Sequence, residues 1–218
     1  MKVYFISGLA ADSRVFRHIV LPEPFEIKHL DWVKPIAGET LSEYAIRMAE
    51  SIDTNEEFVL AGLSMGGMMA AEIAKIHPPL STILISSVAV HTDLPVLFKI
   101  AYHTRLHKIV PVNFLKTISL LKRDFMADNA ADKVILKQVV KDSDPAFIRW
   151  AMNAILQWRN EEKPASCWHI HGSRDEILPL RYTNPTHIIP GGNHLMIMNK
   201  APELNDILKE ILSRYLPA

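Results

Sequence analysis

The sequence predicts an α/β protein with a mostly parallel sheet of about six strands and helices on both faces. Short apolar runs rich in β-branched residues alternate with longer runs of helical periodicity, and the short runs are continuously apolar. Such strands are typical of a parallel sheet that is covered on both sides. The 218 residues, 49% of them hydrophobic, suit one domain with a well-buried core.

Six short apolar segments that end near glycine, proline or serine are expected as strands: residues 2–7, 25–32, 57–63, 81–87, 167–172 and 186–190. Four core helices are expected from apolar residues at helical spacing: residues 12–20, 40–52, 65–77 and 202–215. Thr40 and Glu43 have the spacing of a capping box, which marks the start of the second helix.

Residues 91–160 interrupt this alternation, because they contain helical patterns only, at residues 94–106, 112–121, 131–140 and 145–158. Ligands of open α/β sheets bind at the carboxyl ends of the strands, so an insertion after the fourth strand can cover the site. We therefore expect residues 1–90 and 161–218 to form the core and residues 91–160 to form a helical cap or lid.

Composition argues against several classes of protein. Lysine plus arginine and aspartate plus glutamate number 24 each, which gives no electrostatic footprint for nucleic acid or an anionic membrane. The single cysteine, Cys167, allows no intramolecular disulfide and is expected to be a buried, inert thiol. The apolar run before Gly8 is too short for a signal peptide or a membrane span, so we expect a cytoplasmic protein without membrane insertion.

The stretch AGLSMGG at residues 61–67 places Ser64 between Gly62 and Gly66, where an expected strand meets an expected helix. A serine on such a sharp turn has strained backbone geometry, and its neighbours two positions away must be small because strand and helix nearly touch. Taken alone, the motif is also compatible with an ordinary turn of small residues. As a nucleophile elbow, it requires a base and an acid elsewhere in the chain.

Two later residues complete the pattern. His194 follows the sixth expected strand in PGGNH, and Asp175 follows the fifth. One histidine among ten is a weak indication, and an aspartate in a loop is often only solvated. However, the order Ser64, Asp175, His194 is that of a nucleophile, acid and base at three strand ends. His169 and His171, in or at the end of the fifth strand, are interpreted as structural.

A tetrahedral oxyanion needs two N–H donors. The amide of Met65, directly after the serine, is one candidate, and the amide of Leu9, after the turn at Gly8, is the other. A plain turn at the end of the first strand is the alternative interpretation of that loop.

These motifs resemble the α/β-hydrolase superfamily, in particular its small esterase-like and lipase-like members with a helical cap. The resemblance depends on residues 8–9, 62–67, 171–175, 179 and 191–194, and it spans nearly the whole chain except residues 90–163. It implies Ser64 as nucleophile, Asp175 as acid and His194 as base. It also implies the amides of Leu9 and Met65 as the oxyanion hole.

The chain departs from the family pattern in two places. The oxyanion loop usually begins with His-Gly, whereas this chain has Ser7-Gly8. The chain also begins directly on the strand before that loop, so we expect the family's first two strands, an antiparallel edge, to be absent. We therefore expect a trimmed sheet in which the strand at residues 1–7 lies nearer an edge than usual.

The expected activity is cleavage of a carboxylic ester or thioester of a small, largely apolar substrate through an acyl-serine intermediate. No metal or organic cofactor is expected, because the chain lacks a Cys/His cluster with metal spacing and PGGNH lacks the Lys-Ser/Thr of a phosphate loop. No partner other than the substrate is predicted, and the oligomeric state is not predicted.

Apolar side chains of the expected cap and core are candidates for the substrate pocket, although plain packing explains them equally: Phe98, Tyr102, Phe147, Trp150, Ile155, Met65 and Leu195. Four basic residues are candidates for contact with an acidic acyl group or for a solvated face: His103, Arg105, His107 and Lys108.

Two other functions stay open. A Ser-Met-Gly-Gly elbow with a helical cap also occurs in relatives that eliminate small acids in menaquinone synthesis or break carbon–carbon bonds. A ligand-sensing protein that keeps the three residues and uses the cap as a switch is the other, since a fold does not determine the substrate.

Overall fold

A single parallel sheet forms the centre of the computed structural model, which describes residues 1–105, 110–112, 116 and 129–216. Its strands lie in the order β2-β1-β3-β4-β5-β6, and every neighbouring pair is parallel. The strands are β1 (Lys2–Ile6), β2 (Glu26–Leu30), β3 (Phe58–Leu63), β4 (Ser81–Ile85), β5 (Cys167–Gly172) and β6 (His187–Ile189). All six expected strands are therefore confirmed.

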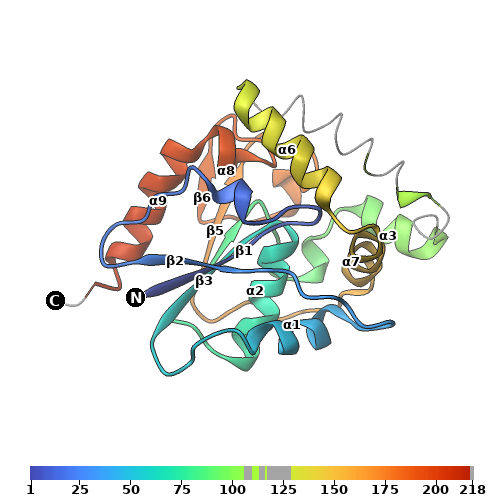
Figure 1. Cartoon of the computed structure of the whole chain (residues 1–218), viewed down its shortest axis with the longest axis horizontal. Helices are drawn as coiled ribbons and strands as arrows, with labels where there is room; N and C mark the ends of the chain where they lie inside the picture. The colour runs from blue at the N-terminus through green and yellow to red at the C-terminus, as the bar shows by residue number, and fades with distance from the viewer. Residues whose placement is uncertain (106–109, 113–115, 117–128, 217–218) are drawn as a thin grey trace.

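The first strand lies near an edge of the sheet, as expected from the sequence. β1 lies second in the sheet, beside the edge strand β2 (Figure 1). β2 is shorter than the expected segment 25–32, and of its five residues only Leu30 is fully buried. An edge strand pairs on one side only, so fewer contacts hold its ends in extended pairing.

Helices cover both faces of the sheet (Figure 1). On one face lie α1 (Leu41–Ala49) and α2 (Met65–Ile76), and on the other lie α8 (Met196–Asn199) and α9 (Ala201–Ser213). The expected capping box at the start of α1 is present, with the Thr40 side chain and the Glu43 amide bonded. Two large apolar clusters, one per face, make up the core and fix the sheet between them.

The helix expected at residues 12–20 is wrong in length. Only a 3-10 turn, η1 (Ser13–Phe16), forms there, capped by the side chain of Asp12. It buries Val15 and Phe16 in the core. The flanking Ile19 and Val20 are β-branched and favour extended backbone, so the segment ends after one turn. The short helix α8, directly after residue 194, was not predicted.

Between β4 and β5 the described residues form helices only, which agrees with the expected insertion. These are the turn η2 (His91–Asp93), α3 (Val96–Thr104), α6 (Ala130–Asp142) and α7 (Pro145–Gln157). They lie at the carboxyl ends of the strands (Figure 1). The helix expected at residues 112–121 falls mostly outside the described residues, as do His107 and Lys108.

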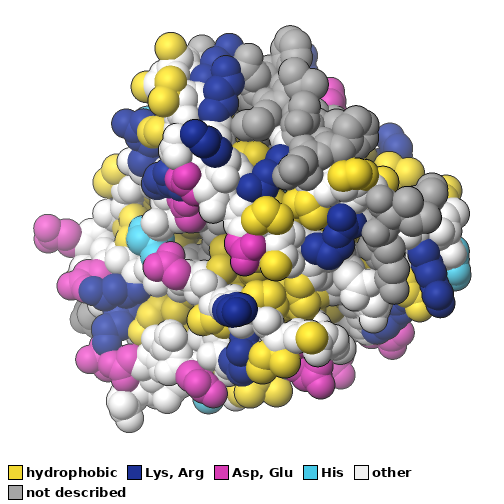
Figure 2. Space-filling view, turned by 45° about the vertical axis from the view of Figure 1, so that its right-hand side comes forward, with side chains coloured by type: hydrophobic (Ala, Val, Ile, Leu, Met, Phe, Trp, Pro, Cys, Tyr) yellow, Lys and Arg dark blue, Asp and Glu magenta, His cyan; other side chains and the backbone are white. Residues whose placement is uncertain are grey.

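In the described ranges, no helix has the length and apolar character needed to cross a bilayer. On the face drawn in Figure 2, lysine and arginine side chains alternate with aspartate and glutamate side chains around exposed hydrophobic ones. This mixture matches the formal net charge of zero and gives that face no field of one sign.

Candidate active site

The turn between β3 and α2 has the strained geometry that the sequence predicts. Ser64 lies at φ 53° and ψ −120°, a region that residues with a side chain rarely adopt. A Cβ atom on Gly62 would collide with the backbone of Gly66, and one on Gly66 would collide with the Ile6 carbonyl of β1. Only glycine therefore allows strand and helix to come this close, and the close approach holds Ser64 at the carboxyl edge of the sheet.

Ser64, His194 and Asp175 meet at this edge from three different strand ends. His194 Nε2 lies 2.9 Å from Ser64 Oγ, and His194 Nδ1 lies 2.8 Å from Asp175 Oδ2. The Asp175 side chain is fully buried and that of His194 is 8% exposed, whereas Ser64 is partly accessible. The structure thus brings together the three residues that the sequence singled out, with the serine oxygen on the side nearest solvent.

Asp175 accepts hydrogen bonds from two backbone amides as well as from His194. Its Oδ1 accepts the amides of Ile177 and Leu178, at 2.9 and 2.8 Å. Burial raises the pKa of Asp175, but the nearby His194 and the amide bonds outweigh burial and leave this pKa below its usual value. The carboxylate is therefore ionised at neutral pH, with a single orientation.

The loop after β1 lies directly against the serine. A Cβ atom on Gly8 would lie 3.3 Å from the Ser64 Cβ, so the backbone before Leu9 passes the serine side chain at contact distance. Ser7 Oγ donates to the Ala11 carbonyl at 2.9 Å and so closes this loop from within. The serine that replaces the usual family histidine thus supports the loop by a hydrogen bond of its own.

The other expected donor, the amide of Met65, belongs to the first residue of α2. The first amides of an α-helix have no carbonyl partner inside the helix, and the helix dipole adds positive potential there. Ser87 Oγ, which follows β4, donates to the Ser64 carbonyl at 2.6 Å and fixes the turn from the far side. The Met65 amide thus directly follows Ser64 at the start of α2, and the Gly8 backbone, which precedes Leu9, lies against the Ser64 side chain.

The candidate pocket residues fall into two groups. Phe98, Phe147, Trp150 and Ile155 pack with Met65 in the apolar cluster on the α1 and α2 face. Leu195 belongs to the cluster on the opposite face and is 5% exposed, so the structure does not bring it together with them. Tyr102 is 38% exposed and lies under the guanidinium of Arg159, with ring centroid and Cζ 4.6 Å apart.

A cavity of about 370 Å³ borders the loop after β1. Ala10 and Ala11 of that loop line it together with Trp32 and Phe147. Trp32 was not predicted as a site residue, although it is the last residue of an expected strand. Its Nε1 donates to the Ala11 carbonyl at 3.2 Å, so the indole is held as a wall of this cavity.

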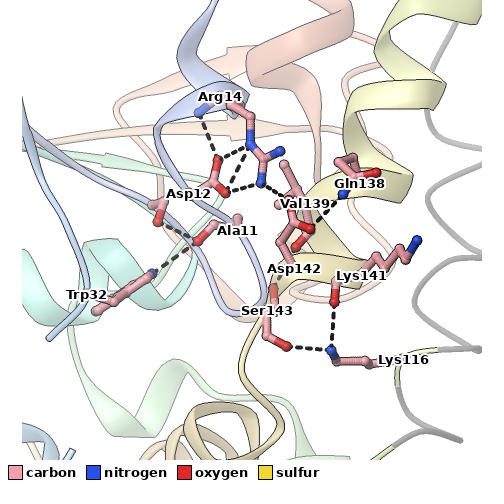
Figure 3. A network of polar contacts seen from close by, with 11 residues as sticks. Ala11, Asp12, Arg14, Trp32, Lys116, Gln138, Val139, Lys141, Asp142 and Ser143 are labelled. Atoms are coloured by element: carbon pink, nitrogen blue, oxygen red, sulfur yellow. Dashed lines mark hydrogen bonds and ion pairs between the residues drawn. The ribbon is translucent and has the colours of Figure 1, made fainter. Parts of the chain in front are cut away.

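The inserted helices are tied to the same loop by charge. Arg14 donates to Asp12 of the loop and, at 2.9 Å, to Asp142 at the end of α6 (Figure 3). These side chains are 37 to 45% exposed, so solvent screens the pairs. The ion pair between Arg14 and Asp142 therefore aligns α6 with the loop, and breaking it costs little free energy.

The expected basic residues and the cysteine are placed as follows. His103 lines a cavity of about 220 Å³ with Lys99 and Arg159, and Arg105 is the left-handed residue that ends α3.

Cys167 is half-buried, and burial raises the pKa of its thiol to about 11. This thiol is protonated at neutral pH, as expected for an inert cysteine. No cluster of metal-binding side chains occurs among the described residues.

The profile of the Alpha/beta hydrolase family matches residues 8–207. The chain belongs to the alpha/beta hydrolase family. The match runs from the loop after β1 to α9, so it includes Ser64, Asp175 and His194. No curated protein sequence matches the chain.

Solved structures of this family share the fold over nearly the whole chain. A thermophilic esterase from Thermogutta terrifontis is 17% identical with a TM-score of 0.73, covering 98% of this chain and 90% of that one. MenH from S. aureus is 15% identical with a TM-score of 0.75, covering 98% and 94%. ClbQ from the colibactin NRPS/PKS pathway is 13% identical with a TM-score of 0.60, covering 98% and 97%. At these identities the likeness establishes the fold, and function has to be argued from the site.

Proposed function

We propose that the protein is a serine hydrolase that cleaves a carboxylic ester or thioester of a small, largely apolar substrate. One observation carries this proposal: the unbroken hydrogen-bonded series from Ser64 Oγ through His194 to Asp175, at 2.9 and 2.8 Å. An alcohol oxygen is a weak nucleophile, and an imidazole backed by a buried carboxylate is the arrangement that activates it.

Acylation begins when Ser64 Oγ attacks the carbonyl carbon and its proton passes to His194 Nε2. The carbonyl π electrons move to oxygen, which becomes an oxyanion. Collapse of this intermediate expels the alcohol or thiol, and His194 gives the leaving group its proton. Water then attacks the acyl-serine in the same way, with His194 as base, and releases the acid and free Ser64.

Asp175 has two functions in this cycle. Its Oδ2 accepts the Nδ1–H of His194, which leaves Nε2 as the lone-pair nitrogen facing Ser64. Its ionised state then stabilises the imidazolium that forms during each proton transfer. The amides of Ile177 and Leu178 keep the carboxylate oriented, so this stabilisation needs no rearrangement.

The amides of Leu9 and Met65 bind the oxyanion. Met65 offers the first amide of α2, and the contact of Gly8 with the Ser64 side chain brings the Leu9 backbone to the same side. Donors that are fixed before the reaction stabilise developing charge without reorganisation. The hydrogen bond from Ser7 Oγ keeps the loop in this shape.

Residues 91–160 act as a cap that selects the substrate. Their helices stand at the carboxyl edge, and Phe147 of α7 lines the cavity beside the loop after β1. Trp32 and two alanines complete the apolar part of that wall, which suits a small apolar acyl or alcohol group.

A lyase-type reaction on the same scaffold is the second candidate, since MenH has this fold. Elimination or carbon–carbon cleavage would use the same base but would leave no acyl group on Ser64. A sensor that retains the three residues would turn over at most once. Both alternatives are outcomes of the test below.

Turnover of a short p-nitrophenyl ester by wild type and by Ser64→Ala tests the proposal. Loss of the nucleophile is expected to lower kcat by about 10⁴-fold or more. Ser213→Ala, which removes a hydroxyl that only bonds the Lys209 carbonyl of its own helix, is the matched control and should retain wild-type kcat. Equal turnover by Ser64→Ala would exclude the serine mechanism, and slow wild-type turnover with no acyl-serine would favour the lyase.

A further inference from the structure

Two buried histidines of β5 lie behind Asp175. His171 Nε2 lies 2.7 Å from the Leu178 carbonyl, at hydrogen-bond distance, and 3.4 Å from Asp175 Oδ2, the same oxygen that holds His194. His169 Nε2 lies 3.0 Å from His171 Nδ1. A hydrogen-bonded pair of imidazoles therefore lies against Asp175 and extends along β5 away from the serine.

The partners fix the protonation of His171. A carbonyl oxygen only accepts, so His171 Nε2 must carry a hydrogen to bond Leu178. Burial lowers the pKa of His171 and outweighs the Leu178 and Asp175 contacts, so the ring is neutral and its Nδ1 is an acceptor. His169 must then donate from Nε2, and burial lowers the pKa of His169 to about 3. Both rings are thus neutral, with one tautomer each.

The charged surroundings of the pair support this assignment. Asp175 and His194 face His171, and Lys163 acts on His169 from a distance. Among these, Asp175 is the only anion, and it is fully buried. A neutral ring whose N–H end lies 3.4 Å from this carboxylate stabilises its charge without adding a second cation beside His194.

Plain packing does not require these residue types. β5 pairs with a strand on each side, and burying an imidazole costs free energy unless both nitrogens are bonded. An aliphatic side chain would fill the space of His171, whose side chain is fully buried, without that cost. What an aliphatic side chain cannot supply is a hydrogen-bond donor to the Asp175 loop.

We propose that His171, held in one tautomer by His169, is a positioning residue: its Nε2–H holds the Leu178 carbonyl, and the Leu178 amide in turn orients Asp175 toward His194. This inference rests on the proposed function, since it assigns a role to the acid of that site. His171 bridges the end of β5 and the Leu178 backbone, so it also fixes the turn on which Asp175 lies.

The test compares three variants with wild type by the pH profile of kcat/KM on a short p-nitrophenyl ester. His171→Leu removes the donor, and His171→Gln restores an N–H near the position of Nε2. His187→Gln is the matched control, because His187 lies on β6 and contacts Thr186 and Trp168 outside this series.

Without the His171 dipole, the carboxylate attracts the proton of His194 more strongly. For His171→Leu we expect the acid limb of the profile to move up by about one pH unit and kcat to fall about tenfold. His171→Gln should reverse most of the shift of the acid limb and most of the fall in kcat. His187→Gln should match wild type. A folded His171→Leu enzyme whose acid limb coincides with that of wild type would overturn the proposal.

If His171→Leu does not fold, His169→Leu is tested in its place. The His169→Leu substitution removes only the donor to His171 Nδ1. It should shift the acid limb in the same direction by a smaller amount, and an unshifted limb would overturn the proposal. Nitrogen-15 histidine spectra of the wild-type protein give a readout that needs no turnover. They should show His171 as the neutral Nε2–H tautomer from about pH 5 to pH 9. The neutral Nδ1–H tautomer would also contradict the proposal.

These readouts separate the two hypotheses. If Ser64 proves not to be a nucleophile while the spectra still show the expected tautomer, the proposed function fails and the hydrogen-bonded pair remains. If Ser64 is the nucleophile and His171→Leu has an unshifted profile, the positioning role fails alone.

Discussion

The carboxyl edge of the sheet and the inserted helices are held in opposite ways. At the edge, Asp175 and His171 are fully buried, and both are held by hydrogen bonds to the backbone of residues 177 and 178. In the insertion, α3 buries none of its residues, and its Leu97 is 71% exposed. In the proposed function, chemistry therefore depends on a region with one arrangement, and substrate selection depends on a region with fewer internal constraints.

The largest expected effect is at the edge. Asp175→Asn keeps the size of the side chain but presents the wrong group to His194 Nδ1, so the histidine changes tautomer. We expect kcat on a short ester to fall about 10⁴-fold, measured by steady-state kinetics. Asp53→Asn, which alters a surface pair with Lys2, is the control and should leave kcat unchanged. A loss smaller than tenfold for Asp175→Asn would mean that the edge does not act as a unit.

The second effect is on stability, where the insertion rejoins the core. Trp158 is 3% exposed, and its Nε1 donates to the buried Glu72 at 2.6 Å. Trp158→Phe should lower the free energy of unfolding by about 2 kcal/mol, because a buried bond to a charged group is lost. Urea unfolding measures this, with Trp168→Phe as the control, since its 3.3 Å bond to Tyr215 is weaker.

If the bond from Trp158 to Glu72 contributes to stability but not to catalysis, kcat of Trp158→Phe should stay within about threefold of wild type. Equal destabilisation of the two tryptophan variants would argue against the buried Glu72 as the stronger anchor.

The third effect concerns pH and the buried histidines. The unfolded chain protonates His169 near its ordinary pKa of 6.5, whereas the folded chain holds this pKa at about 3. Between these values the unfolded state binds the extra proton, so the free energy of unfolding falls as pH falls, by up to about 1.4 kcal/mol per pH unit. Urea unfolding between pH 7 and pH 4 should show a flatter dependence for His169→Gln.

His103→Gln is the control for this pH series, because His103 on α3 is exposed and should not change the slope. Parallel curves for wild type and His169→Gln would show that the histidine is not held neutral.

The smallest effect is at the contact between the two regions. Arg14→Gln removes the link from Asp12 to Asp142 (Figure 3), whose side chains are partly exposed. The free energy of unfolding should fall by less than about 1 kcal/mol. A double-mutant cycle with Asp142→Asn measures the coupling between Arg14 and Asp142. A coupling far above this value would place the contact among the main anchors of the insertion.

Local patterns made the edge predictable from the sequence. The six strands are continuous apolar runs, and the glycines around Ser64 are required by close backbone approach, so both are visible in a few neighbouring residues. The order of Ser64, Asp175 and His194 then followed from the strand ends. The length of the segment at residues 12–20 and the short helix α8 were missed, because packing rather than local pattern determines them.

Long-range side-chain contacts outside the Ser64, Asp175 and His194 series were not predictable. The sequence places His171 at the end of a strand but does not show that its ring turns toward Asp175 and Leu178. The bond from Trp32 to Ala11 and the link from Arg14 to Asp142 join residues 21 and 128 positions apart. Such pairs depend on how the elements pack, which one sequence does not specify.

The most direct measurement of the central claim is labelling of the purified protein with a fluorophosphonate, followed by mapping of the modified residue. The phosphonyl group bonds only to an activated oxygen beside an oxyanion hole, so no knowledge of the substrate is needed. The account predicts stoichiometric modification of Ser64, and strongly reduced labelling in Asp175→Asn. An unmodified Ser64, or a label on another residue at the same rate in both proteins, would contradict it.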